Sequence, residues 1–194
     1  MSFIKSLFLG SEGNYQFCGF DVSFKKRHPS SRLPLLGRVY RILHQRYLYT
    51  FVHEFAHNLA FKIFANCSSK TCIYMDGNGL TFPDRTRFSA RSVSPKIMSI
   101  ILAVGPLAIT AFAGSSLALS LALRHSLPLV SHWCIGSASY AILDEQLYSI
   151  YSVYKRDNGD FGHLTRQPFS HLAAASVAQI GIFILSMYAA YRAY

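Results

Sequence analysis

The stretch from Tyr47 to Ala65, YLYTFVHEFAHNLAFKIFA, decides how this chain is interpreted. It is mostly apolar and close to the ~20 residues that a helix needs to cross the hydrocarbon core of a bilayer. It nevertheless carries His53, Glu54 and His57. Such side chains are costly in lipid unless they are paired or bind something. A bound metal ion would compensate that cost.

The spacing of these three residues is that of the motif H-E-x-x-H. On a helix, His53 and His57 lie one turn apart on the same face, so both imidazoles can share one ion. Glu54 follows the first histidine and can deprotonate a water whose pKa the ion lowers toward about 7. This chemistry is that of peptide hydrolysis. The alternative is a set of polar core groups that bind no metal, but the motif inside an apolar stretch favours the metal.

A third ligand is required, because catalytic zinc sites usually take three protein ligands and leave the fourth position to water. The acidic candidates in the later apolar segments and at their ends are Asp144, Glu145, Asp157 and Asp160. Asp157-Asn158-Gly159-Asp160 contains a glycine that permits a tight backbone. Taken alone, this string is more typical of a solvated turn at a helix end. Together with the histidine motif, it is the favoured source of the third ligand.

The composition favours a membrane protein. Hydrophobic residues make up 51% of the chain and charged residues 14%, against roughly 25% charged residues in soluble domains. There are 19 Lys and Arg against 9 Asp and Glu, and many of the basic residues precede Tyr47, as on the cytoplasmic side of a first span. Because the basic residues lie between apolar runs, nucleic-acid binding is disfavoured. The scattered cysteines predict free thiols or at most one disulfide.

The apolar segments predict an all-α membrane protein with about four transmembrane helices and a small β-hairpin between the first and the second. Residues 1–46 are predicted to be a basic polar tail, in which alternation from Tyr15 to Phe24 suggests a short strand pair, and residues 47–194 the membrane domain. We expect no cleaved signal peptide and a multi-pass protein of a bacterial inner membrane. The predicted spans are Tyr47 to Ala65, Ile97 to Leu123, Leu129 to Tyr154 and His171 to Ala190, with the hairpin at Cys72 to Phe82.

Three elements resemble the site-2 protease family of intramembrane metalloproteases, over about Tyr47 to Leu164. Phe51-Val52-His53-Glu54-Phe55-Ala56-His57 followed by Ala60 resembles the first core helix of that family. Ala103-Val104-Gly105-Pro106-Leu107 resembles the small-Gly-Pro element of its second core helix, which a hairpin normally precedes. The segment Gln146 to Leu164 occupies the place of the third core helix, where the family has an Asp-Gly motif and this chain has Asn158 before Gly159.

The resemblance implies a zinc ion, Zn²⁺, held by His53, His57 and one aspartate, with Glu54 as general base. It also implies a membrane-spanning or membrane-associated protein as the substrate, cut within the lipid bilayer. Asp160, next to the glycine, is the preferred third ligand, and Asp157 is the alternative.

Other functions fit part of the pattern. A membrane metal-binding or transport protein accounts for the two histidines, since intramembrane His and Asp also mark ion pathways. It does not require Glu54 directly after the first histidine, whereas a hydrolase does. A catalytically inactive protease-like scaffold is a further alternative. A soluble zinc protease is disfavoured by the long uncharged run from Ile97 to Leu123.

Overall fold

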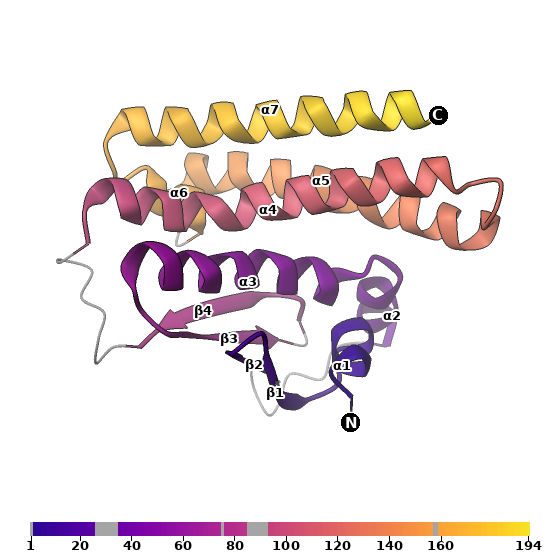
Figure 1. Ribbon diagram of the computed structural model, residues 1–194, viewed down its shortest axis with the longest axis horizontal. Coiled ribbons are helices and arrows are strands. Elements are labelled where there is room, and N and C mark those ends of the chain that lie inside the picture. Colours follow the sequence, from indigo (N-terminus) through magenta and orange to yellow (C-terminus); the bar gives the residue numbers. More distant parts are fainter. Residues whose placement is uncertain (1, 26–34, 75, 85–92, 157–158) are drawn as a thin grey trace. The chain divides into compact units, whose positions relative to one another are not determined.

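The computed structural model describes residues 2–25, 35–74, 76–84, 93–156 and 159–194, and for residues 35–38 it describes the backbone alone. The chain divides into two compact units, Met1–Ser94 and Pro95–Tyr194. Each unit has its own set of packed elements, so each is described by itself (Figure 1).

In its described residues, the first unit combines a four-stranded sheet with three helices. Strands β1 and β2 pair antiparallel, β2 and β3 pair parallel, and β3 and β4 pair antiparallel, in the order β1-β2-β3-β4. The parallel pair is possible because helices α2 and α3 form the crossover between its strands. The elements are α1 (Phe3–Leu9), β1 (Gly13–Phe17), β2 (Phe20–Lys25), α2 (Leu35–Leu43), α3 (Arg46–Ala65), β3 (Ser69–Tyr74) and β4 (Gly79–Pro83).

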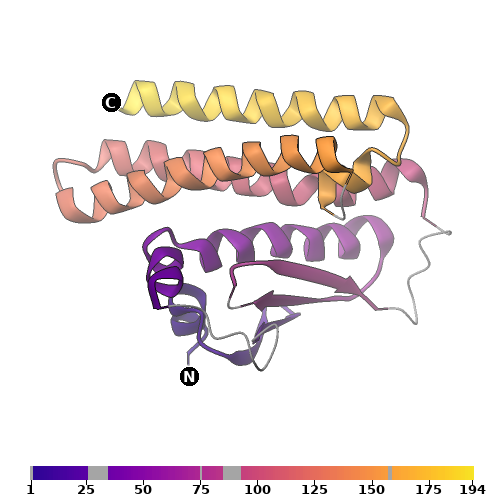
Figure 2. The same cartoon turned by 180° about the vertical axis from the view of Figure 1, so that it is seen from behind.

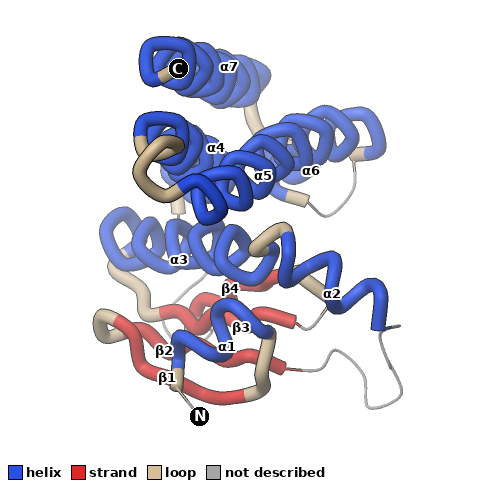
Figure 3. Tube along the Cα trace, turned by 90° about the vertical axis from the view of Figure 1, so that its right-hand side faces the viewer, coloured by secondary structure: helices blue, strands red, loops and turns tan. Residues whose placement is uncertain are grey.

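Helix α3 lies along one face of this sheet (Figure 3). The core between them is built on Tyr47 and Phe51 from α3, Val22 and Phe24 from β2, and Ile73 from β3, all buried. Alternation along the strands explains this arrangement, because every second side chain points toward the helix. The helix ends at Asn66, which adopts a left-handed conformation at φ 47°. Both strand pairs predicted from alternation are therefore present, but they belong to one sheet.

The second unit is a helical bundle in which α4 packs against both α5 and α7 (Figure 2). Its elements are α4 (Pro95–Ala122), α5 (Pro128–Lys155), α6 (Asp160–Leu164) and α7 (Phe169–Ala193). Helix α5 begins at a proline, whose fixed φ suits the first turn. Buried hydrogen bonds also join the helices, such as the one that the Gln179 amide donates to Ser149 Oγ at 3.0 Å.

Close packing of α4 on α7 depends on Gly114. A Cβ added at this position would collide with Oγ and Cβ of Ser186. Small residues of this kind let two apolar helices approach each other closely.

We therefore expect Gly114→Ala to lower the free energy of unfolding by about 1–3 kcal/mol, the usual cost of overpacking a tight contact. The double variant Gly114→Ala/Ser186→Gly should recover most of that loss, since it removes the colliding atoms. Gly136→Ala is the matched control, because a Cβ at Gly136 has nothing within 4 Å. Thermal unfolding of detergent-purified protein checks this series, and a Gly114→Ala protein as stable as wild type would contradict it.

Two helices of the described chain are long and apolar enough to cross a membrane, by length and composition. They are α4 and α7. In the most apolar stretch of each helix, 50% of α4 and 17% of α7 is buried. They correspond to the spans predicted at Ile97 to Leu123 and His171 to Ala190.

The predicted all-α fold with about four transmembrane helices is wrong. The protein is a mixed α/β structure with a four-stranded sheet and two candidate spans among the described residues. Helix α3 fails as a span because it carries Arg46, Lys62 and the H-E-x-x-H motif, and it uses one face to cover the sheet. Helix α5 fails because it carries Asp144, Glu145 and several serines.

Candidate metal centre

Helix α3 brings the two motif histidines together on one face. His53 Nε2 and His57 Nε2 lie 3.2 Å apart, and their ring centroids are 4.9 Å apart. Two nitrogens that each bind a tetrahedral zinc at about 2.05 Å are about 3.3 Å apart. His57 is buried and His53 partly buried. The two nitrogens share a hydrogen bond in this structure, and their separation is also compatible with two ligands of one metal ion.

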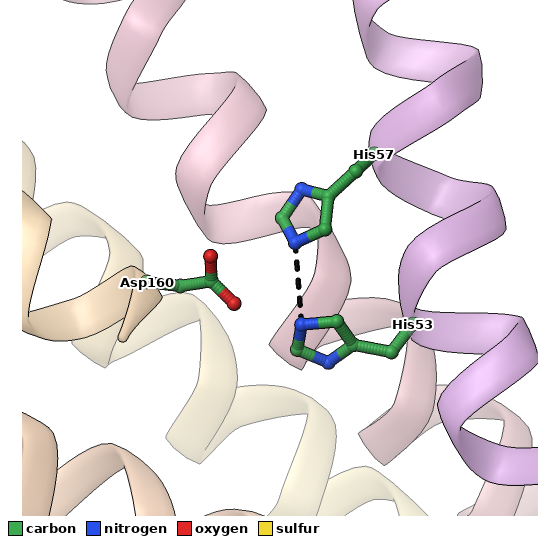
Figure 4. A group of neighbouring side chains, drawn as sticks. All are labelled: His53, His57 and Asp160. Atoms are coloured by element: carbon green, nitrogen blue, oxygen red, sulfur yellow. Dashed lines mark hydrogen bonds between the residues drawn. The ribbon is translucent and has the colours of Figure 1, made fainter. Parts of the chain in front are cut away.

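His53, His57 and Asp160 form a group that could hold a metal ion (Figure 4). Each residue offers one ligand atom, and these atoms lie within 4.8 Å of one another. Two imidazoles and a carboxylate are a donor set suited to zinc, which accepts both nitrogen and oxygen ligands. The sequence-based alternative, Asp157, lies outside the described residues.

Asp160 is placed by the short helix α6. It stands in the first turn of this helix, and its backbone N–H donates to Tyr148 Oη at 3.3 Å. Phe161 and Leu164 anchor the helix because both are buried in a cluster with residues of α4 and α7. The Gly162 N–H also donates to Ser152 Oγ at 2.9 Å. Local packing thus fixes the backbone that carries the carboxylate.

Glu54 is buried against strand β4, with 6% of its surface exposed. Thr81 Oγ1 lies 2.8 Å from Glu54 Oε2 and 3.0 Å from the backbone oxygen of Glu54. Beside this contact, a Cβ added at Gly79 would lie 2.6 Å from Glu54 Oε1. The strand therefore leaves room for the carboxylate and also offers it a hydrogen-bond donor.

Sequence reasoning missed four polar residues that connect Glu54 to the sheet through hydrogen bonds. Thr81 and Thr71 face each other across β4 and β3, with their Oγ1 atoms 3.2 Å apart. Asn58, fully buried on α3, donates to Thr71 Oγ1 at 2.5 Å and accepts a hydrogen bond from Ser69 Oγ. Two features of the sequence could have indicated these contacts. Asn58 follows the motif by one residue, and β3 and β4 carry small polar residues at alternate positions.

The other acidic candidates lie on α5, outside this group. Glu145 is buried and Asp144 partly buried. Neither belongs to the metal-ligand group found among the described residues. All four cysteines are free thiols, which agrees with one of the two predicted states.

His53, His57 and Asp160 could hold a metal ion, and Glu54 follows His53 directly in the sequence. A bound metal ion can acidify a water, and a carboxylate within reach of that water can take its proton. No protein-family model, curated protein or solved structure matches this chain.

Proposed function

We propose that this protein is a zinc metalloendopeptidase of the site-2 protease type, which cuts a peptide bond in a membrane-spanning or membrane-associated protein. The observation that carries the proposal is the 3.2 Å separation of His53 Nε2 and His57 Nε2 on a helix that also buries Glu54. A metal-binding or transport site would explain the histidine pair alone. The hydrolase also explains why a carboxylate follows the first histidine and is held in place.

Each residue has a distinct part in the proposed reaction. His53, His57 and Asp160 would hold the ion. When bound, zinc would act as a Lewis acid that polarises the scissile carbonyl and lowers the pKa of a water. Glu54 takes a proton from the attacking water and returns it to the leaving amine.

The edge position of β4 suggests how the substrate is held. A peptide can be cut only when its carbonyl is exposed, so a helical substrate has to unwind locally. An extended segment can then pair with the free edge of a sheet through backbone hydrogen bonds. We propose that β4 provides this edge, since it is the last strand of the sheet and the strand that carries Thr81 beside Glu54. The apolar helices α4 and α7 support the proposed location in a lipid bilayer.

Glu54→Gln tests the proposal most directly. The change should leave zinc binding intact and lower hydrolysis at least about a hundredfold, because general-base catalysis is worth roughly 10² to 10⁴ in rate. Full-length protein in liposomes is incubated with a panel of single-span membrane peptides, and fragments are identified by mass spectrometry. Glu12→Gln is the control, since Glu12 is an exposed carboxylate outside the motif.

Zinc-loaded wild type that cuts none of the panel would contradict the protease proposal and would favour a metal-binding membrane protein. Equal cleavage by wild type and Glu54→Gln would show that the hydrolysis does not come from this site.

A further inference from the structure

A polar network interrupts the apolar layer between α3 and the sheet. Much of this layer is made of aromatic and aliphatic side chains, such as Phe51, Val22 and Ile73. At one end of the strands, Thr50 of α3 also donates a buried hydrogen bond to Gly77 O at 2.7 Å. Beside Glu54, however, α3 presents Asn58, and the strands present Thr71, Thr81 and Ser69. Burying polar groups costs free energy unless every group is hydrogen-bonded. An apolar layer would avoid that cost, so the network calls for a role other than packing.

The donors and acceptors of this network allow its hydrogen bonds to run in one direction, toward Glu54. Ser69 donates to the Asn58 carbonyl oxygen, which leaves the Asn58 amide group to donate to Thr71 at 2.5 Å. The Thr71 hydroxyl proton is then available to Thr81, whose Oγ1 lies 3.2 Å away. Thr81 has a single hydroxyl proton, and Glu54 Oε2 at 2.8 Å is its closest acceptor. Hydrogen bonds arranged in series strengthen one another.

Gly79 restricts the same carboxylate sterically. Its missing side chain leaves the space that Glu54 occupies, because a Cβ there would lie 2.6 Å from Glu54 Oε1 and 2.8 Å from Cδ. Gly79 and Thr81 alternate along β4 and both face α3. One strand therefore supplies both the space for the Glu54 side chain and the donor to it.

We propose that Thr81 and Gly79 are positioning residues for Glu54. They hold its carboxylate in one orientation before a substrate or an ion arrives, so that proton transfer needs no rearrangement. The inference rests on the proposed function, since it assigns a purpose to Glu54 as the general base. Two residues of β4 thus determine the orientation of the Glu54 carboxylate. Asn58, Thr71 and Ser69 direct the hydroxyl proton of Thr81 toward that carboxylate.

The test uses acetohydroxamate, a small zinc chelator whose acidic N–O–H group can pass its proton to a carboxylate beside the ion. Its affinity for the zinc-loaded, detergent-purified full chain is measured by calorimetry. Thr81→Val should weaken binding on the order of tenfold, because the variant loses a hydrogen bond to a charged group. Thr81→Ser keeps the hydroxyl and should bind as wild type does. Zinc content should stay at about one ion per chain in each of these variants.

Two further variants separate positioning from general stability. Gly79→Ala should weaken acetohydroxamate in the same way by displacing Glu54, and it keeps the test decisive if Thr81→Val fails to fold. Thr110→Val is the matched control, because it removes a buried hydroxyl that donates to Pro106 O at 2.9 Å within α4, outside the unit that holds Glu54.

The outcomes are distinguishable. If zinc-loaded Thr81→Val and Gly79→Ala bind acetohydroxamate with wild-type affinity, this inference is wrong. The proposed metal site would not be affected by that result. Wild-type protein that holds no zinc would overturn the proposed function and this inference with it. Weakened binding in both variants, with recovery in Thr81→Ser and no effect in Thr110→Val, would support it.

Discussion

His57→Ala should purify without zinc, while the wild-type protein should purify with about one zinc ion per chain. The expectation follows from geometry, since His57 Nε2 is one of two nitrogens that lie 3.2 Å apart, as ligands of one tetrahedral ion would. Loss of one protein ligand from a three-ligand site leaves too few donors for stable binding. His53→Ala should have the same effect. Elemental analysis of protein purified in detergent without chelator checks both.

The matched control is His132→Ala. His132 is an exposed histidine on α5, and its Nδ1 lies 2.6 Å from Pro128 O. His132→Ala removes one imidazole, as His57→Ala does, but at a position outside the proposed centre. Its zinc content should be that of wild type. Full zinc content in His57→Ala would show that the metal binds elsewhere, and the proposed centre would then be wrong.

The same measurement identifies the third ligand. Asp160→Asn should lose zinc as well, because an amide oxygen is a much weaker zinc donor than a carboxylate. Asp157→Asn should keep it if the structural group of His53, His57 and Asp160 is the binding site. The opposite result would assign the ligand to Asp157. Asp144→Asn, a partly buried carboxylate of α5, controls for the charge change.

The sequence predicted the local parts of this protein well. The motif from His53 to His57 places two possible metal ligands on one face of a helix, because four residues make about one turn whatever the rest of the chain does. The helices α4 and α7 were also predictable, since long uncharged runs have few alternatives. Both depend on residues that are neighbours in the sequence.

Pairing between distant segments was not predictable in the same way. Alternation indicates that β2 and β3 are strands, but nothing local says that Val22 lies opposite Thr71 in a parallel pair. The two strands lie on either side of α2 and α3 in the sequence, so their pairing is a contact between distant segments. The prediction of α3 as a membrane span failed for the same reason. Tyr47 to Ala65 was predicted as an apolar helix, but the sheet that covers one of its faces is formed from residues far along the chain.

The positioning of Glu54 also depends on a contact between residues that are far apart in the sequence. Thr81 is 27 residues from Glu54, and its role appears only when β4 is placed beside α3. A threonine at an alternate position of a strand is common, so it predicts no function alone. Asp160 could be predicted as a candidate because the histidine motif requires a third ligand. The choice between it and Asp157 depends on how the backbone around Gly159 folds.

Two lysines in the middle of α7 should prevent this helix from crossing the bilayer. Ile180 and Ile184 lie one turn apart and are 54% and 59% exposed, as expected for side chains that face lipid. A lysine at the centre of a spanning helix costs about 2.5–3.5 kcal/mol on insertion scales. Ile180→Lys/Ile184→Lys should therefore move a tag placed after Tyr194 to the opposite side of the membrane. Protection of the tag from added protease in sealed vesicles measures that side.

The matched control adds the same charge at a different depth. Tyr191→Lys/Tyr194→Lys places two lysines beside Arg192 at the end of α7, where long side chains can reach the aqueous interface. The tag should stay on the wild-type side in this variant, because the apolar centre of the helix is intact. If the central lysines also leave the tag where it was, α7 does not span the membrane. Only 17% of the apolar stretch of α7 is buried. The rest of that apolar surface would then need a protein partner to cover it.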